Sequence, residues 1–161
     1  MREIYIKSIR KLRQNKEEIE SRLKIKITIK GTNVFIKGNS ADEYFAERII
    51  LALDFPFLPE DAFLLMKEDY LFEVINIKSH TKRTDFEVIK GRIIGTKRKT
   101  LKVLETLTNA VFAVKDNDVA IIAPAYEMHK AYQAIISLIH GSKQGNVYAR
   151  LEKARKAQLG E

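Results

Sequence analysis

Residues 90–102 read Lys90-Gly91-Arg92-Ile93-Ile94-Gly95-Thr96-Lys97-Arg98-Lys99-Thr100-Leu101-Lys102, and this stretch carries six cationic side chains and no acid. Apolar residues at helical spacing precede it from 86 to 94 and resume from 100 to 107, and Gly95 interrupts the pattern between them. The pattern predicts two helices joined by a tight glycine loop. Free backbone N–H groups and the helix dipole at the start of the second helix favour an anion, so we expect a phosphate-binding loop.

A second interpretation of the same stretch is structural. A cationic run such as Lys97-Arg98-Lys99 is usually a solvated loop when it stands alone, and apolar residues at helical spacing are usually core. The apolar pair, the glycine, the cations and a downstream strand pattern occur together here. This combination favours phosphate binding over a plain surface loop.

The composition restricts the class of protein. With 161 residues the chain can form one ordinary domain or two small ones, and the absence of cysteine excludes disulfides and cysteine-based zinc sites. No apolar run approaches the roughly 20 residues that span a bilayer, and the first seven residues alternate like a strand and lack the apolar segment of a signal peptide. We expect a soluble cytoplasmic protein without a membrane segment and without a cofactor.

The net charge of +8 is spread unevenly along the chain. Residues 1–54 carry 12 basic and 8 acidic side chains, residues 55–78 carry 2 and 5, and residues 79–161 carry 15 and 8. Two basic parts therefore flank an acidic middle. This distribution favours nucleic acid as the partner over two weaker interpretations, an acidic membrane surface or a charge that serves only solubility.

The chain contains an internal repeat of strand and helix patterns. In the first half we predict a strand at 3–6, two helical pieces within 8–23 that break near Gln14-Asn15, a hairpin of strands at 23–30 and 34–37, and a helix at 40–53. In the second half we predict a strand at 71–77, the two helices around Gly95, strands at 111–114 and 119–122, and a helix at 126–140. Each half then has the order β-α-α-β-β-α.

The two halves can be aligned on their apolar positions in this interpretation. The alignment sets Ile19 on Val103, Lys11 on Gly95 and Gln14 on Arg98. The first unit is therefore predicted to lack the glycine loop and to act as a structural partner with a secondary basic surface.

The predicted domains are 1–54, a connector at 55–70, and 71–161. The connector has two prolines, a short helix predicted from 59 to 66, and too many apolar residues for a free linker. We expect it to pack the two units rigidly; a docking patch for another protein is the alternative. After a glycine-bounded loop at 140–146, residues 147–156 predict a short basic helix, interpreted either as a packed terminal helix or as an extra RNA contact.

The segment from Ile93 to Leu104, followed by Thr108-Asn109-Ala110, resembles the core of a KH domain. In that family a G-x-x-G loop joins two helices and clamps the backbone of about four nucleotides. The resemblance implies an α+β fold of two tandem type I KH domains. One departure is Arg98, which stands at the second glycine and could contact phosphate directly through its planar guanidinium.

The arrangement of the whole chain is similar to a two-KH ribosome-assembly factor, the partner of the Nob endonuclease, in its short archaeal form. That resemblance implies binding of single-stranded rRNA near the 3′ end of the small-subunit rRNA. It also implies cooperation with the endonuclease that matures this end and with other assembly factors of the pre-40S or pre-30S particle. A general KH adaptor of an RNA-processing or degradation complex is the alternative.

The candidate RNA-binding residues combine cations, loop backbone and apolar groove positions. In this hypothesis the loop holds phosphates, and Leu104 joins three of the apolar residues in a groove floor for unstacked bases. The residues are Arg92, Ile93, Gly95, Thr96, Lys97, Arg98, Lys99, Leu101, Lys102 and Phe112.

The sequence offers little to an enzyme. His80, His129 and His140 lack metal-ligand spacing, and the cationic stretch lacks the G-x-x-x-x-G-K-[ST] nucleotide loop. Ser79, His80 and Asp85 have the residue types of a catalytic triad but lie in a polar segment. We therefore expect a protein that is not an enzyme and holds no metal.

Overall fold

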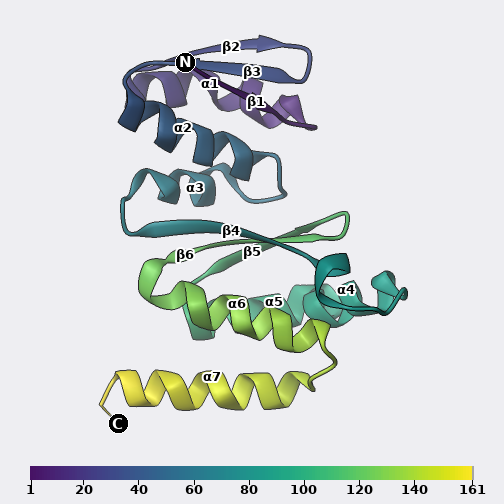
Figure 1. Ribbon diagram of the computed structural model, residues 1–161. Helices are drawn as coiled ribbons and strands as arrows, with labels where there is room; N and C mark the ends of the chain where they lie inside the picture. Colours follow the sequence, from purple (N-terminus) through teal and green to yellow (C-terminus); the bar gives the residue numbers. More distant parts are fainter. Residues whose placement is uncertain (161) are drawn as a thin grey trace. The chain divides into compact units, whose positions relative to one another are not determined.

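The computed structural model describes residues 1–160 and divides into two compact units, Met1–Tyr70 and the chain from Leu71 onward. Each unit has its own sheet with helices packed against it (Figure 1). The sheets have the strand orders β1-β3-β2 and β4-β6-β5. The prediction of an α+β fold of two tandem KH units is confirmed, because the chain forms two three-stranded antiparallel sheets, one in each unit.

The first unit has a central strand, β3, between two edge strands. Its elements are β1 (Arg2–Tyr5), α1 (Ile9–Leu23), β2 (Lys26–Lys30), β3 (Asn33–Lys37), α2 (Ser40–Leu53), α3 (Pro59–Ala62) and a 3₁₀ turn (Phe63–Met66). Residues 55–70 belong to this compact unit. Within it, the Lys11 Nζ donates to the carbonyl of Phe55 at 2.7 Å, which holds the start of the connector against α1.

The predicted break near Gln14-Asn15 is wrong, because α1 is one continuous helix. Its apolar residues Leu12, Ile19 and Leu23 are all buried. The Asn15 Nδ2 donates to the Lys11 carbonyl at 2.7 Å, so its amide bonds within the helix instead of ending it. The first unit therefore has the order β-α-β-β-α and is one helix shorter than predicted.

The second unit has the full β-α-α-β-β-α order, followed by a terminal helix. Its elements are β4 (Tyr70–Asn76), a 3₁₀ turn (Ile77–His80), α4 (Phe86–Ile94), a 3₁₀ turn (Thr96–Arg98), α5 (Lys99–Thr108), β5 (Val111–Lys115), β6 (Asp118–Pro124), α6 (Ala125–Ile139) and α7 (Gln144–Gln158). The helices α4 to α6 lie along one face of the sheet (Figure 1). Their apolar residues and those of the strands form one buried cluster that includes Ile93, Leu104, Phe112 and Ile121.

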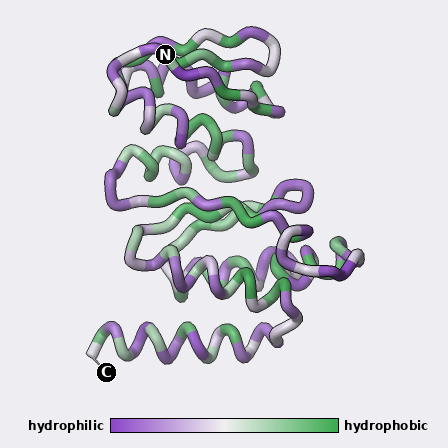
Figure 2. Tube along the Cα trace, in the orientation of Figure 1, coloured by the Kyte–Doolittle hydropathy of each residue, from purple (hydrophilic) through white to green (hydrophobic). Residues whose placement is uncertain are grey.

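The terminal helix α7 packs on α5 and α6. Val147 and Leu151 are buried in that contact and belong to the core cluster of the unit. Hydrophilic positions alternate with these apolar ones along the helix (Figure 2). The predicted short basic helix is thus a packed helix with a charged outer face. None of the helices within residues 1–160 is both long and apolar enough to cross a membrane.

The alignment of the two units differs by one position from the predicted one. The strand β2 begins at Lys26 and β5 begins at Val111, whereas the predicted alignment sets Lys26 on Ala110. The preceding helices end in left-handed residues that match in the same corrected alignment, Lys24 and Asn109, each with φ of 53°. The helical spacing of apolar residues does not by itself fix the alignment of the two units to a single residue, whereas the strand registers and the helix caps do.

The corrected alignment changes which residues correspond. Ile19 matches Leu104, and both are fully buried, instead of the half-buried Val103. Arg13, and not Gln14, falls on Arg98. The first unit still lacks the glycine loop, because Arg10 stands where the second unit has Gly95.

Candidate nucleic-acid interface

Gly95 ends α4 and permits the loop that follows it. Its φ is +76°, in the left-handed region that L side chains rarely adopt. A Cβ at this position would lie 2.6 Å from the Thr100 backbone nitrogen and 2.9 Å from the Thr100 Cβ. Two independent constraints, a backbone angle and a close approach to the first turn of α5, therefore require glycine here.

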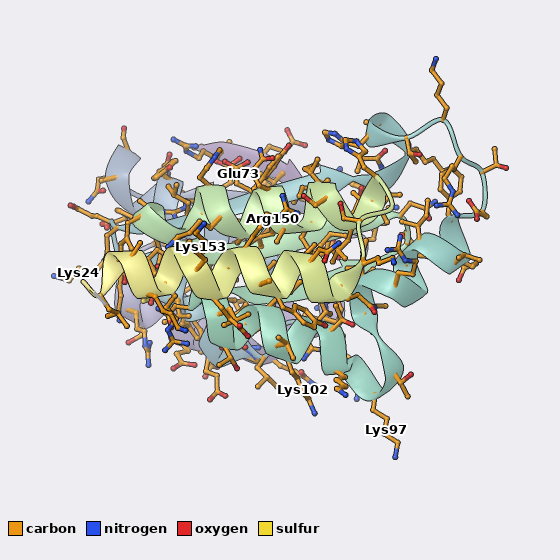
Figure 3. All side chains as sticks on the ribbon, turned by 90° about the horizontal axis from the view of Figure 1, so that it is seen from below. Lys24, Glu73, Lys97, Lys102, Arg150 and Lys153 are labelled. Atoms are coloured by element: carbon orange, nitrogen blue, oxygen red, sulfur yellow. The ribbon has the colours of Figure 1, made fainter. Side chains whose placement is uncertain are left out.

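The loop itself has strained backbone and exposed cations. Lys97 and Arg98 have φ of 53° and 62°, and the Arg98 N–H donates to the Gly95 carbonyl at 3.2 Å to close the turn. No side chain caps the start of α5, so no carboxylate competes for an anion there. Lys97, Lys99 and Lys102 are exposed, and within the described residues none forms an ion pair. Lys97 and Lys102 extend away from the ribbon in Figure 3.

Arg98 is exposed like the other loop cations, but its guanidinium is bonded to the fold. Its Nη2 donates to the Phe112 carbonyl at 2.9 Å and lies 3.5 Å from the Glu105 Oε2. The same Glu105 oxygen accepts the Phe112 N–H at 3.1 Å. β5 is an edge strand, and the N–H and the carbonyl of Phe112 point toward its open side. The contacts with Glu105 and Arg98 therefore occupy both of these backbone groups. The predicted phosphate contact of Arg98 requires these bonds to open.

Arg92 has a structural position that sequence reasoning did not find. Its Nη1 donates to the Leu138 carbonyl at 3.2 Å, and its Nη2 donates to the Ser142 carbonyl. The Gln144 Nε2 in turn donates to the Arg92 carbonyl at 2.9 Å and contacts the Thr100 Oγ1 at 3.1 Å. Arg92 thereby joins α4 to the end of α6 and the start of α7. These contacts join segments far apart in the sequence, so no local sequence pattern predicts them.

The apolar residues predicted as a groove floor lie in the core. Ile93 and Leu104 are 0% exposed, Phe112 is 1% exposed and Leu101 is 2% exposed. Their side chains pack against one another in the core and offer no surface to a base in this conformation. Their place in the predicted site is corrected to one of support: they fix the positions of the loop and of the β5 edge.

A shallow groove beside the loop was not predicted. It lies on the outer face of α5, next to α7, and Val103 and Leu107 give it an apolar floor. The full lining is Thr96, Lys97, Lys99, Lys102, Val103, Thr106, Leu107 and Glu152. Three of the predicted cations thus stand along one apolar strip, a combination that suits a charged backbone with attached bases.

The residues of a possible triad do not assemble. The Ser79 Oγ donates to the Asn76 Oδ1 at 3.1 Å, and the Asp85 carboxylate binds Arg83. The hydrogen bond from Arg83 lowers the pKa of Asp85 below its ordinary value. Among residues 1–160 no group of three or more His, Asp or Glu side chains is placed to hold a metal ion.

The β-α-α-β-β-α order, the glycine-led loop between α4 and α5 and the edge strand beside it define the second unit as a type I KH domain. A family model described as a eukaryotic type KH domain, KH-domain type I, matches residues 71–156. That match covers more than half of the chain. The chain belongs to the PNO1/Dim2 family of KH-domain proteins, and the family prediction is confirmed.

Curated relatives agree with this family. The KH domain-containing protein MJ0443 of Methanocaldococcus jannaschii is 30% identical over 148 residues, which cover 88% of this chain and 65% of that protein. The pre-rRNA-processing protein PNO1 of Candida albicans is 29% identical over 140 residues, which cover 84% of this chain and 50% of that protein. The chain therefore spans between half and two thirds of the length of these relatives.

Solved structures match along nearly the whole chain. A chain of the a/eIF2alpha–aDim2p–rRNA complex from Pyrococcus horikoshii OT3 is 33% identical with a TM-score of 0.88, covering 97% of this chain and 94% of that one. The structure of Dim2p from the same organism is 34% identical with a TM-score of 0.86, covering 95% and 99%.

Proposed function

We propose that this protein is an RNA-binding ribosome-assembly factor that binds single-stranded rRNA near the 3′ end of the small-subunit rRNA. The observation that carries the proposal is the loop of residues 95–98, in which Gly95 sets the backbone and Lys97, Lys99 and Lys102 stand exposed without acidic partners. The relatives support it: several are named pre-rRNA-processing proteins, and the Pyrococcus horikoshii relative forms a complex with rRNA and a/eIF2alpha.

In the proposed mechanism, a phosphate approaches the uncapped start of α5 while the three lysines neutralise the neighbouring phosphates. Each contact to a single strand contributes roughly −0.7 to the slope of log K against log salt, so three contacts give a slope of about −2. The apolar strip of Val103 and Leu107 lies beside these cations and offers a surface for unstacked bases.

Arg98 takes part only after a rearrangement. Its guanidinium occupies the Phe112 carbonyl, which faces the open edge of β5, where a base edge would otherwise be read. Binding of RNA at that edge exchanges this internal bond for a phosphate contact of Arg98. Where the G-x-x-G loop has its second glycine, this loop has Arg98, whose side chain must move before RNA binds at the edge of β5.

The partners follow from the same proposal. The protein would not act as an enzyme itself and would assist maturation of the rRNA by an endonuclease in the cytoplasm. The complex of the relative suggests a/eIF2alpha as a further partner, beside other assembly factors of the pre-30S or pre-40S particle.

The test is binding of a labelled oligonucleotide from the 3′ end of the small-subunit rRNA, against a scrambled oligonucleotide, across salt concentrations. Lys97→Gln with Lys99→Gln is expected to weaken binding and to reduce the slope by about 1.4. Lys82→Gln, an exposed cation of the same unit outside the loop, is the control and should reduce the slope by less than half of that. Absence of binding to either oligonucleotide would refute the proposal.

A general RNA adaptor is the second candidate. The lysines contact phosphates, and such contacts carry no sequence information by themselves. Equal binding of the native and scrambled oligonucleotides would favour this adaptor over a factor specific for rRNA.

A further inference from the structure

At Phe112, the open edge of β5 offers hydrogen-bond acceptors and no free donor. The hairpin of β5 and β6 closes on the pair Lys115 and Asp118, so the alternation of the antiparallel ladder directs the N–H and the carbonyl of Phe112 toward the open side. The N–H already donates to the Glu105 Oε2 at 3.1 Å. The backbone carbonyl and the neighbouring carboxylate therefore remain as the groups that a ligand at this edge would meet.

The Glu105 carboxylate can accept further hydrogen bonds. Its side chain is 23% exposed, so solvent or a ligand reaches it from the open side of the strand. Both of its protein contacts, the Phe112 N–H and the Arg98 guanidinium, are made through Oε2, and within residues 1–160 the Oε1 atom accepts no hydrogen bond. A carboxylate has about four acceptor positions on its two oxygens, so this one has several left.

Arg98 shows which kind of group fits these acceptors. Its Nη2 lies 2.9 Å from the Phe112 carbonyl oxygen and 3.5 Å from the Glu105 Oε2. A guanidinium is planar, carries a fork of N–H donors and has no acceptor. The Arg98 side chain is also 45% exposed and extends from a loop, so a competing ligand can displace it. The arginine is thus an internal occupant of a site that accepts planar donors.

Guanine resembles this occupant more closely than the other RNA bases do. Its Watson–Crick edge places the N1–H beside the N2 amino group, and these atoms form a planar guanidine-like fragment. Adenine and cytosine place a ring nitrogen acceptor beside their amino group, and uracil places a carbonyl oxygen on each side of its N3–H. Such acceptors would face the Phe112 carbonyl and the Glu105 carboxylate, and two acceptors that meet without a donor lose binding energy.

We propose that Glu105 is a specificity-determining residue that selects guanine at the edge of β5. The carboxylate accepts the N1–H and one hydrogen of the N2 amino group, and the Phe112 carbonyl accepts the other amino hydrogen. The displaced Arg98 guanidinium then becomes available to a phosphate. The inference rests on the proposed function, because it assumes that this unit binds single-stranded RNA.

The test uses the full chain and short strands of seven nucleotides in which uridines flank one central base. The central base is guanine, adenine, cytosine, uracil or hypoxanthine, and the last of these keeps the N1–H of guanine but lacks its amino group. We expect the guanine strand to bind roughly tenfold tighter than the adenine, cytosine and uracil strands, and the hypoxanthine strand to lose most of that advantage. Fluorescence anisotropy at fixed salt measures the dissociation constants.

Glu105→Gln tests the residue itself. The amide oxygen can still accept the Phe112 N–H, whereas the amide nitrogen offers donors where the native carboxylate offers acceptors. The preference for guanine over adenine should fall to less than about threefold. Glu152→Gln is the matched control, because Glu152 is an exposed carboxylate of the same unit in the neighbouring groove. It should change the binding of all strands by the same factor.

The outcomes separate this inference from the proposed function. Salt-dependent binding with equal affinity for all strands, or with a preference for another base, would overturn the selection of guanine and leave the proposed function standing. A guanine preference that persists in folded Glu105→Gln would overturn the role of Glu105. Absence of binding to every strand would overturn the proposed function as well. If Glu105→Gln does not fold, the comparison of guanine with hypoxanthine on the native chain decides.

Discussion

Replacement of Gly95 by alanine tests the backbone of the loop most directly. The alanine must adopt φ near +76°, and its Cβ must approach the Thr100 nitrogen to 2.6 Å unless the first turn of α5 moves. The left-handed conformation costs a non-glycine residue about 1–2 kcal/mol. Relief of the overlap by a backbone shift costs about 1–3 kcal/mol more.

We therefore expect Gly95→Ala to lower the free energy of unfolding of the second unit by about 2–5 kcal/mol. For a unit of this size that corresponds to a fall in Tm of roughly 8–40 °C. Urea unfolding and thermal unfolding, both followed by circular dichroism, measure the two quantities. RNA affinity should fall as well, because the movement of α5 displaces Lys99 and Lys102.

Gly91→Ala is the matched control for this change. Gly91 lies inside α4 with no atom within 4 Å of an added Cβ, so alanine should stabilise the helix by about 0.5–1 kcal/mol. If Gly95→Ala unfolds at the same temperature as Gly91→Ala, the close approach to Thr100 does not exist in solution and the reasoning is wrong.

Substitutions at three other positions give separate tests. Arg98→Gly loses the bond to the Phe112 carbonyl but relieves the left-handed backbone at this position, so the free energy of unfolding should change by less than about 1 kcal/mol. Arg98→Ala loses the same bond and keeps the backbone strain. In urea unfolding it should be about 1 kcal/mol less stable than Arg98→Gly. Arg92→Ala should destabilise the second unit by about 1–3 kcal/mol, because Arg92 bonds to carbonyls of the fold. The same change should leave the salt slope of RNA binding unchanged. A smaller slope would place Arg92 in the RNA interface. The backbone N–H of Gly38 lowers the pKa of Glu43 below its ordinary value of 4.5, so the carboxylate stabilises the first unit above that value and loses this effect as the pH falls through its lowered pKa. Glu43→Gln should accordingly be less stable than the native chain at pH 7, with the difference shrinking toward pH 3; a constant difference would contradict the linkage.

Local pattern was sufficient for most of the second unit. The predicted helix at 86–94 is α4 with the same bounds, and Gly95 follows it as expected. The apolar periodicity and the glycine that interrupts it are properties of neighbouring residues. They predict the helices correctly because the tertiary contacts of this unit stabilise the same helices that the local pattern favours. In the first unit the same reasoning failed at Gln14-Asn15, where burial of Leu12 and Ile19 keeps the helix continuous against a weak local signal.

The α+β class, the two repeated units, the family resemblance and the cationic glycine loop all follow from the sequence, because each rests on patterns of residues close together in the chain. The roles of the individual site residues depend on tertiary contacts instead. Arg92 and Arg98 look alike in sequence to the exposed lysines beside them, yet their guanidinium groups bond to carbonyls 46 and 14 residues away. The open edge of β5 is likewise a product of strand order, and strand pairing joins residues whose closeness no local pattern records.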